Sequence, residues 1–81
     1  MDKRIGAVAI IIEEKESVQR ANTIMSEYSD IIVGRMGIPY KEKNVSVISI
    51  IVDGTTDEIG ALAGKLGKLH GVMVKSALTK K

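Results

Sequence analysis

Two runs rich in β-branched residues constrain the fold of this chain more than any other feature. The first, residues 4–13, reads RIGAVAIIIE, and the second, residues 45–53, reads VSVISIIVD. Such residues are enriched in β-strands. In the first run apolar side chains fall on both alternating faces, with Ile5, Ala7, Ala9 and Ile11 on one and Val8, Ile10 and Ile12 on the other. We therefore expect both runs to be central strands that are apolar on two sides.

Each of these runs is followed by an amphipathic helical pattern. Residues 16–28 carry apolar side chains at helical spacing, namely Val18, Ala21, Ile24, Met25 and Tyr28. The second pattern begins where Thr55 and Glu58 have the spacing of a capping box, and its apolar stripe is Ile59, Leu62, Ala63, Leu66 and Leu69. Gly71 is expected to end this helix as a C-terminal glycine.

Two further strands complete the order. Residues 30–38 predict a strand that Pro39 ends, because proline cannot donate a hydrogen bond to a sheet. The dipeptide at residues 53–54, Asp-Gly, predicts the turn after the third strand, and residues 72–78 supply the last strand. Right-handed crossovers in each βαβ half then predict an α+β fold, the ferredoxin-like βαββαβ sandwich, with a four-stranded antiparallel sheet and two helices on one face.

The small size of the chain predicts association. Residues 1–81 form one predicted domain, and a domain of this size buries only about 60% of the surface that its unfolded chain exposes. With no cysteine and one histidine, disulfides and cysteine-based metal sites are absent as reinforcement. Because the helices can cover one face of the sheet and the central strands are apolar on both, we expect a homo-oligomer that pairs sheet edges, sheet faces or both.

Composition argues against nucleic-acid and membrane partners. The net charge is +2, and basic and acidic residues are interleaved rather than clustered on a basic face, so direct nucleic-acid binding is not expected. RNA binders of this fold stack bases on aromatic side chains of the sheet, whereas Tyr28 and Tyr40 fall at the ends of elements. No apolar run reaches the roughly 18 residues of a membrane span, and no secretory signal is recognisable. A cytoplasmic protein is expected.

The sequence predicts neither catalysis nor a metal site or other cofactor. The serines lie in unrelated contexts, so no nucleophile and base can be paired by spacing. One imidazole cannot form a structural zinc site, and His70 is expected to cap a helix or lie at the surface. Gly60, Gly64 and Gly67 flank the apolar stripe of the second helix, and we expect them to pack closely against the first helix or the sheet rather than to contact a ligand.

The segment GRMGIPY, residues 34–40, is the most unusual part of a predicted strand. Glycine weakens a strand and often marks a bulge or the close approach of a ligand or another backbone. Arg35, between Gly34 and Gly37, could offer a planar fork to a carboxylate or a phosphate. Alternatively, it is an exposed arginine that protects an edge strand from aggregation.

This segment also carries a resemblance that spans nearly the whole chain. The segment resembles part of the small proposed regulators of the iron-only hydrogenase system. Other residues of this chain match the same family, namely Arg4-Ile5-Gly6, Glu27-Tyr28, Ile50-Ile51-Val52-Asp53 and Gly64-Lys65-Leu66-Gly67. The resemblance implies an ACT-like module, similar to the regulatory domain of the nickel-responsive repressor, that forms a dimer or a tetramer. It also implies a ligand site between protomers, made by Glu13, Glu14 and Lys15 of one and by Gly34, Arg35, Met36 and Gly37 of its neighbour.

Two functions follow from this resemblance. The first is a regulatory module of the iron-only hydrogenase system that binds a small-molecule effector at the protomer interface. The alternative is a structural module that docks on a hydrogenase maturation protein through its apolar sheet face and has no ligand of its own. The first loop lacks the glycine typical of amino-acid-binding ACT domains, and the histidine and cysteine ligands of the nickel repressor are missing. No DNA-binding segment is left over, so a transcriptional role requires a DNA-binding partner.

Overall fold

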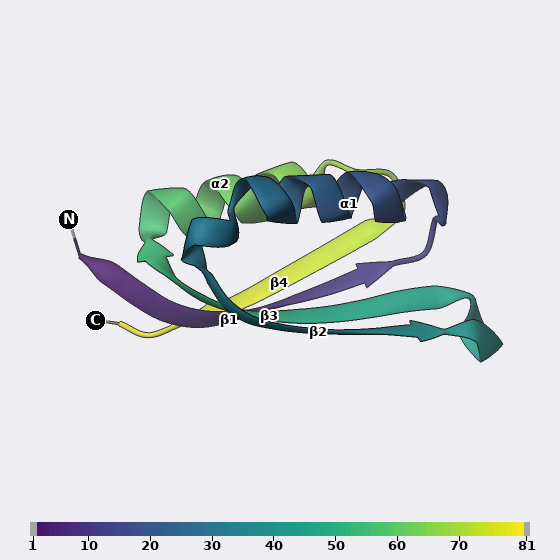
Figure 1. Cartoon of the computed structure of the whole chain (residues 1–81), viewed down its shortest axis with the longest axis horizontal. Coiled ribbons are helices and arrows are strands. Elements are labelled where there is room, and N and C mark those ends of the chain that lie inside the picture. Colours follow the sequence, from purple (N-terminus) through teal and green to yellow (C-terminus); the bar gives the residue numbers. More distant parts are fainter. Residues whose placement is uncertain (1, 81) are drawn as a thin grey trace.

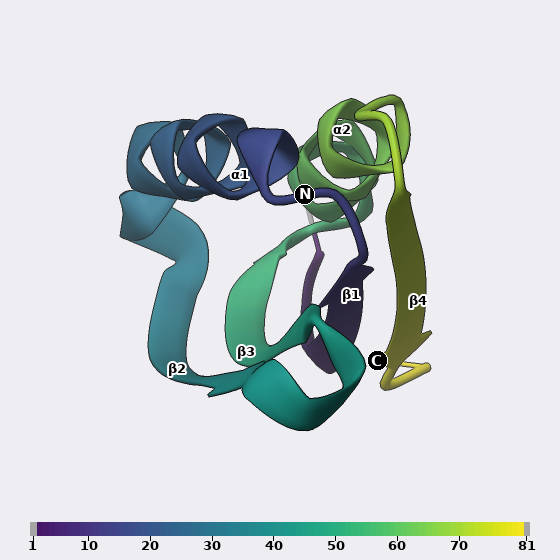
Figure 2. The same cartoon turned by 90° about the vertical axis from the view of Figure 1, so that its right-hand side faces the viewer.

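The computed structural model describes residues 2–80 and has the predicted order of elements. These are β1 (Lys3–Ile12), α1 (Glu16–Glu27), β2 (Ile32–Tyr40), β3 (Val45–Thr55), α2 (Thr56–Gly67) and β4 (Val72–Leu78), with short 3₁₀ turns at Ser29–Ile31 and Lys41–Lys43 on either side of β2. The strands form one antiparallel sheet in the order β2-β3-β1-β4. Both helices lie on the same face of this sheet (Figures 1 and 2). The predicted ferredoxin-like sandwich is confirmed, with β1 and β3 in the centre.

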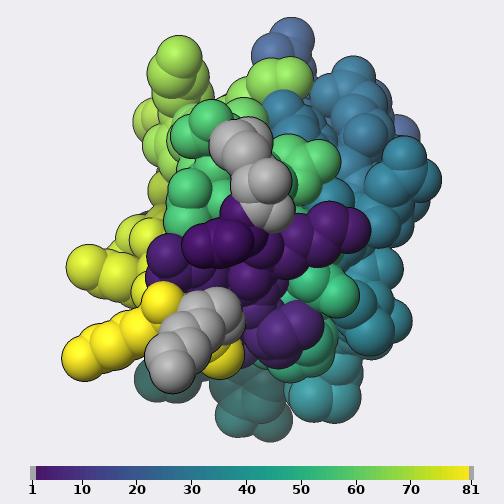
Figure 3. Space-filling view, turned by 90° about the vertical axis from the view of Figure 1, so that its left-hand side faces the viewer, coloured from purple at the N-terminus to yellow at the C-terminus, as the bar shows by residue number. Residues whose placement is uncertain are grey.

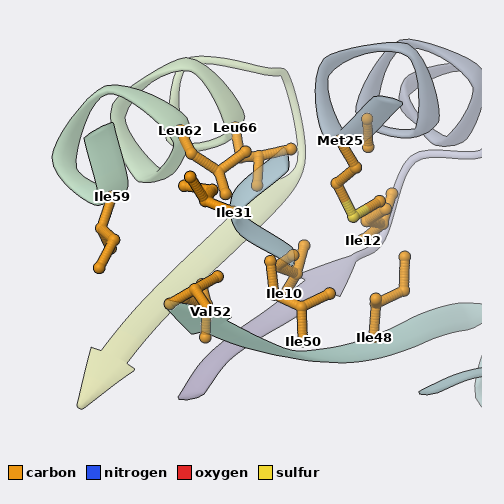
Figure 4. Close-up of a cluster of buried hydrophobic side chains, with 12 residues drawn as sticks. Ile10, Ile12, Met25, Ile31, Ile48, Ile50, Val52, Ile59, Leu62 and Leu66 are labelled. Carbon is orange, nitrogen blue, oxygen red and sulfur yellow. The ribbon is translucent and has the colours of Figure 1, made fainter. Parts of the chain in front are cut away.

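The hydrophobic core lies between the sheet and the two helices. It consists of Val8, Ile10, Ile12, Ala21, Met25, Ile31, Ile48, Ile50, Val52, Ile59, Leu62 and Leu66 (Figure 4). On β1 the helix-facing Val8 and Ile10 have no exposed surface, whereas Ile5 and Ile11 on the other face are 47% and 36% exposed. The prediction that this strand is apolar on two faces is confirmed, and one of those faces is uncovered in the single chain.

The limits of β2 differ from the sequence prediction. The strand begins at Ile32 rather than at residue 30, because Ser29–Ile31 form a 3₁₀ turn after α1. Pro39 does not end it, since the strand continues to Tyr40 and Pro39 pairs with Ser46 of β3. A proline is tolerated there because β2 is an edge strand and needs hydrogen bonds on one side only.

The Asp53-Gly54 dipeptide does not form the predicted turn. Both residues continue β3, which reaches Thr55 and remains paired with β1. The chain reverses at the capping box instead: the Glu58 backbone N–H donates to Thr55 Oγ1 at 3.1 Å, and the Thr55 N–H donates to Glu58 Oε1 at 2.8 Å. The predicted capping box is confirmed, and the chain reverses there rather than at the Asp53-Gly54 turn.

Helix α2 ends at Gly67, four residues before the predicted C-terminal glycine. Gly71 lies in the turn before β4 with φ of +71°, a conformation that side chains disfavour. A Cβ on Gly71 would collide with the side chain of Glu14 in the β1–α1 loop. The Glu13 N–H donates to the Gly71 carbonyl at 2.8 Å, so this glycine joins the two connections at one end of the sheet.

The prediction for the glycines of α2 is wrong. A Cβ added at Gly60, Gly64 or Gly67 would meet no atom of the described chain within 4 Å. They lie on the solvent side of the helix, because the apolar stripe of Ile59, Leu62 and Leu66 faces the core.

The start of β1 and the end of β4 lie side by side at the opposite end of the molecule (Figure 3). The Thr79 N–H donates to the Ile5 carbonyl at 2.8 Å, and Arg4 Nη1 donates to the Thr79 carbonyl at 3.1 Å. Nearby, a Cβ on Gly6 would clash with Leu78, so glycine permits this close approach of the two strands. Within residues 2–80, neither helix has the length and apolar character needed to cross a bilayer.

Candidate functional site

The residues of the GRMG segment, residues 34–37, point to two sides of the sheet. The register of β2 on β3 places Gly34 and Met36 on the face that the helices leave uncovered, which we name the open sheet face, together with Ile51 of β3. Arg35 and Gly37 lie on the helix side. In one protomer these predicted site residues therefore do not form a single cluster.

Arg35 is held by helix α1. Its Nη2 atom donates a hydrogen bond to Asn22 Oδ1 at 2.7 Å, and Arg35 itself is exposed. The contact fastens the edge strand to the helix layer, a role that neither sequence hypothesis included. The other guanidinium N–H groups make no hydrogen bond to residues 2–80 and stay available to a ligand.

The two glycines beside Arg35 are not required by packing within the chain. A Cβ on Gly34 would meet nothing within 4 Å, and one on Gly37 would make ordinary contact with Ile48 at 3.5 Å. The pairing of β2 shifts register between Ile32 and Gly34, so the irregularity of the strand lies directly before this segment. Space beside Gly34 on the open sheet face leaves room for another backbone.

The β1–α1 loop supplies the other predicted site residues. Glu13 bonds to the turn before β4 through its backbone, and Glu14 Oε1 lies 3.6 Å from Nε2 of His70. The His70 side chain is 79% exposed, which confirms its predicted place at the surface. Lys15 follows and lines a cavity.

Within one protomer the loop and the GRMG segment lie at different levels of the sheet. Ile12, which precedes the loop, pairs with Ser46 of β3, and Ser46 pairs with Pro39 of β2. The loop is therefore level with the end of β2, beyond Gly37.

The open sheet face carries large apolar side chains from all four strands. They are Ile5 and Ile11 of β1, Met36 and Ile38 of β2, Val47 and Ile51 of β3 and Met73 of β4, each between 36% and 65% exposed. Charged side chains of this face lie toward its margins, with Asp53 near one end and Lys75 on an edge strand. A contiguous apolar surface of this kind is typical of an interaction site.

Shifted pKa values occur on α2, away from these segments. The hydrogen bond from the Thr55 backbone lowers the pKa of the Glu58 carboxyl below its ordinary value. Hydrogen bonding to Tyr28 raises the pKa of Lys65, whose Nζ lies 5.0 Å from the centre of the Tyr28 ring. Both shifts come from local contacts at the surface of α2. Residues 2–80 contain no group of three or more histidine, cysteine or acidic side chains placed to hold a metal ion.

A cavity of about 340 Å³ opens between the start of α1 and the β2–β3 hairpin. Its lining comprises Ile12, Lys15, Val18, Pro39, Tyr40, Lys41, Asn44, Val45 and Ser46. Of these, the sequence predicted Lys15 as a site residue, and Pro39 and Tyr40 belong to the GRMGIPY segment that it singled out. The others are brought together by the alignment of Ile12, Ser46 and Pro39 across three strands, which no local motif signals.

A second cavity, of about 390 Å³, lies between α1 and the turn after α2. It is lined by Glu16, Ser17, Arg20, Lys68, Leu69 and His70. Ser17 is buried, and its Oγ donates to the His70 carbonyl at 2.6 Å, which ties the start of α1 to this turn.

Comparison with protein families and solved structures relates the chain to regulatory proteins. A family model named TM1266-like, which describes proposed regulators of the iron-only hydrogenase system, matches residues 4–76. The structure of protein TM1266 from Thermotoga maritima superposes with a TM-score of 0.92 at 32% sequence identity, covering 98% of this chain and 100% of that one. A search of curated proteins gave no significant match.

More distant structures share the fold. The ACT domain of GTP pyrophosphokinase from Chlorobium tepidum gives a TM-score of 0.79 at 18% identity, covering 94% of this chain and 100% of that one. The C-terminal domain of the MgtC protein from Mycobacterium tuberculosis gives 0.69 at 14% identity, covering 95% and 88%. The fold is therefore ACT-like, as the resemblance implied.

Proposed function

The chain belongs to the TM1266-like family of proposed iron-only hydrogenase system regulators, and from this premise we propose that it is a non-catalytic, oligomeric regulatory module that binds a small-molecule effector between protomers. The observation that carries the proposal is the open sheet face. Its apolar side chains come from every strand, and the two helices cover only the opposite side (Figure 2).

Burial of this face would stabilise an assembly substantially. Fully burying an isoleucine or methionine side chain contributes about 1.5–3 kcal/mol, and several such side chains are half exposed here. A second copy of the chain is a suitable partner for this face because its own open sheet face is equally apolar. In an isologous interface both partners contribute the same surface. The free space beside Gly34 would allow the backbones to approach closely.

The proposed effector site joins the two predicted segments across protomers. Glu13, Glu14 and Lys15 follow the end of β1, which is level with the end of β2 beyond Gly37, and we assign them to the GRMG segment of a neighbour. The unused donors of Arg35 suit a carboxylate or phosphate group.

Placing a charge on the open sheet face tests the assembly. We expect Ile51→Asp to dissociate the oligomer in analytical ultracentrifugation, because a carboxylate would be buried in an apolar interface. Ala61→Asp, which adds the same charge to the exposed side of α2, is the control and should leave the mass unchanged. Equal masses for wild type and Ile51→Asp would show that this face is not the interface.

Thermal shift measurements test effector binding. Amino acids, nucleotides and divalent metal ions are screened against wild type, Arg35→Ala and the control Arg20→Ala, which removes an exposed arginine of α1. The proposal expects a ligand that raises the melting temperature of wild type and of Arg20→Ala by more than that of Arg35→Ala. If no compound does so, the sensing role is wrong.

The open sheet face also supports a second function, docking on a hydrogenase maturation protein without a ligand. In this case co-purification under native conditions should recover that partner with wild type and lose it with Ile51→Asp. Recovery of the homo-oligomer alone would count against docking.

A further inference from the structure

We propose that the cavity between the start of α1 and the β2–β3 hairpin binds a small organic anion with an apolar body and no cationic group. This hairpin cavity is defined by the lining residues given above. It is formed by a single chain, so the proposal does not require the oligomer, although Lys15 also belongs to the proposed interface site. Its volume of about 340 Å³ lies at the lower end of the range for ligand pockets.

The cavity exists because the hairpin extends past the helix layer. In Figure 1 the β2–β3 hairpin projects beyond the start of α1. Pro39 and Ser46 lie on the helix side of the sheet, level with the last residue of β1, so no helical turn lies above the tip that follows them. The turn Lys41–Lys43 and Asn44, whose φ is +60°, close the tip and fix the shape of this end.

Apolar and polar groups of the cavity are suited to different parts of one ligand. Ile12, Val18, Pro39 and Val45 provide apolar contact surface for a hydrocarbon body. The side chains of Tyr40, Asn44 and Ser46 form no hydrogen bond with any residue from 2 to 80, so their donors and acceptors are free to bind a polar head group.

The charges favour an anion. Lys15 and Lys41 both line the hairpin cavity, and neither forms an ion pair within the described part of the chain. None of the described lining residues is acidic, although Glu16 and Glu42 are sequence neighbours of these lysines. Two unpaired cations attract a carboxylate or phosphate and repel an ammonium group. The cavity should thus accept a 2-oxo acid and reject the amino acid with the same side chain.

Isothermal titration calorimetry at low salt, with amide chemical shifts mapped by NMR, tests this selectivity. The probes are 4-methyl-2-oxopentanoate, leucine and 4-methylpentanamide, which share a branched hydrocarbon body and differ in charge. We expect binding of the oxo acid with shifts at Val18 and Ser46, and little binding of leucine or the amide. Equal binding of leucine, no binding of the oxo acid, or shifts confined to other residues would overturn the proposal.

Charge-removing variants locate the head group. Lys15→Gln and Lys41→Gln should each weaken oxo-acid binding by about 1.5- to 5-fold, the range expected for exposed charge pairs. Lys68→Gln, an exposed lysine that lines the other cavity, is the matched control and should bind like wild type. If all three variants bind equally, the anion does not lie between Lys15 and Lys41.

The same titration on Ile51→Asp separates this site from the proposed oligomer. Because one chain forms the hairpin cavity, binding should persist in a monomeric variant that remains folded by circular dichroism. Loss of binding in folded monomers would show that the site needs a second protomer and would contradict the proposal. Retained binding by a wild type that proves monomeric would instead refute only the interface function.

Discussion

At the scale of single residues, glycines with similar sequence contexts have different roles. Gly71 needs its positive φ and the space beside Glu14, and Gly6 is required where β1 approaches Leu78. Gly34 has neither constraint. The sequence draws attention to Gly34 through its neighbours and to Gly71 as a C-terminal glycine, whereas the contacts of Gly6 with Leu78 and of Gly71 with Glu14 join segments distant in the chain and could not be predicted.

Gly71→Ala is expected to destabilise the fold. The left-handed conformation costs a side chain about 1–2 kcal/mol, and the new Cβ must displace Glu14 as well. Chemical denaturation should therefore show a lower free energy of unfolding. The control Gly64→Ala lies in open space on α2 and should raise that free energy by up to about 1 kcal/mol. The explanation is wrong if both substitutions have the same sign.

Gly34→Ala is expected to affect association rather than folding. In the Ile51→Asp background the substitution should leave the free energy of unfolding unchanged or raise it by up to about 1 kcal/mol, because its Cβ meets nothing. In the wild-type background it should weaken self-association, measured by sedimentation equilibrium. Unchanged association would indicate that no neighbouring backbone approaches Gly34.

At the scale of elements, local signals predicted starts better than ends. The capping box at Thr55 and Glu58 marks the start of α2 because both partners lie within one turn. The length of β3 and the continuation of β2 through Pro39 depend on pairing with other strands. Sequence patterns contain no direct record of that pairing.

The lowered pKa of Glu58 makes the capping box sensitive to acid. Because the folded-state pKa is below the ordinary value of 4.5, the ionised carboxylate stabilises the fold above that pH, and this contribution is lost as the pH falls through the folded-state pKa. Glu58→Gln can still accept the Thr55 N–H but does not titrate.

We therefore expect the free energy of unfolding of wild type to fall relative to that of Glu58→Gln as the pH is lowered from about 5 to 3. Urea denaturation at several pH values measures this difference. The contributions of the other carboxylates to the pH dependence cancel, because both proteins contain them. A difference that is constant over this interval would contradict the role assigned to Glu58.

At the scale of the whole molecule, the fold was predictable and the cavities were not. Two-faced apolar runs identified β1 and β3 as central strands, and the alternation of strand and helix patterns determined the order of elements. The hairpin cavity depends on how far β2 and β3 extend past α1, which is a property of register and length. The alternation of side chains along a strand divides the GRMG segment between two faces, and which pair of residues faces the helices depends on the register of β2 on β3.

The central claim is that the open sheet face is covered by a second copy of the chain. Size-exclusion chromatography with light scattering on the wild type at micromolar concentration measures this most directly. We predict a mass that is a multiple of the 8.7 kDa protomer, in keeping with a dimer or tetramer. A single species with the mass of one protomer would contradict the claim.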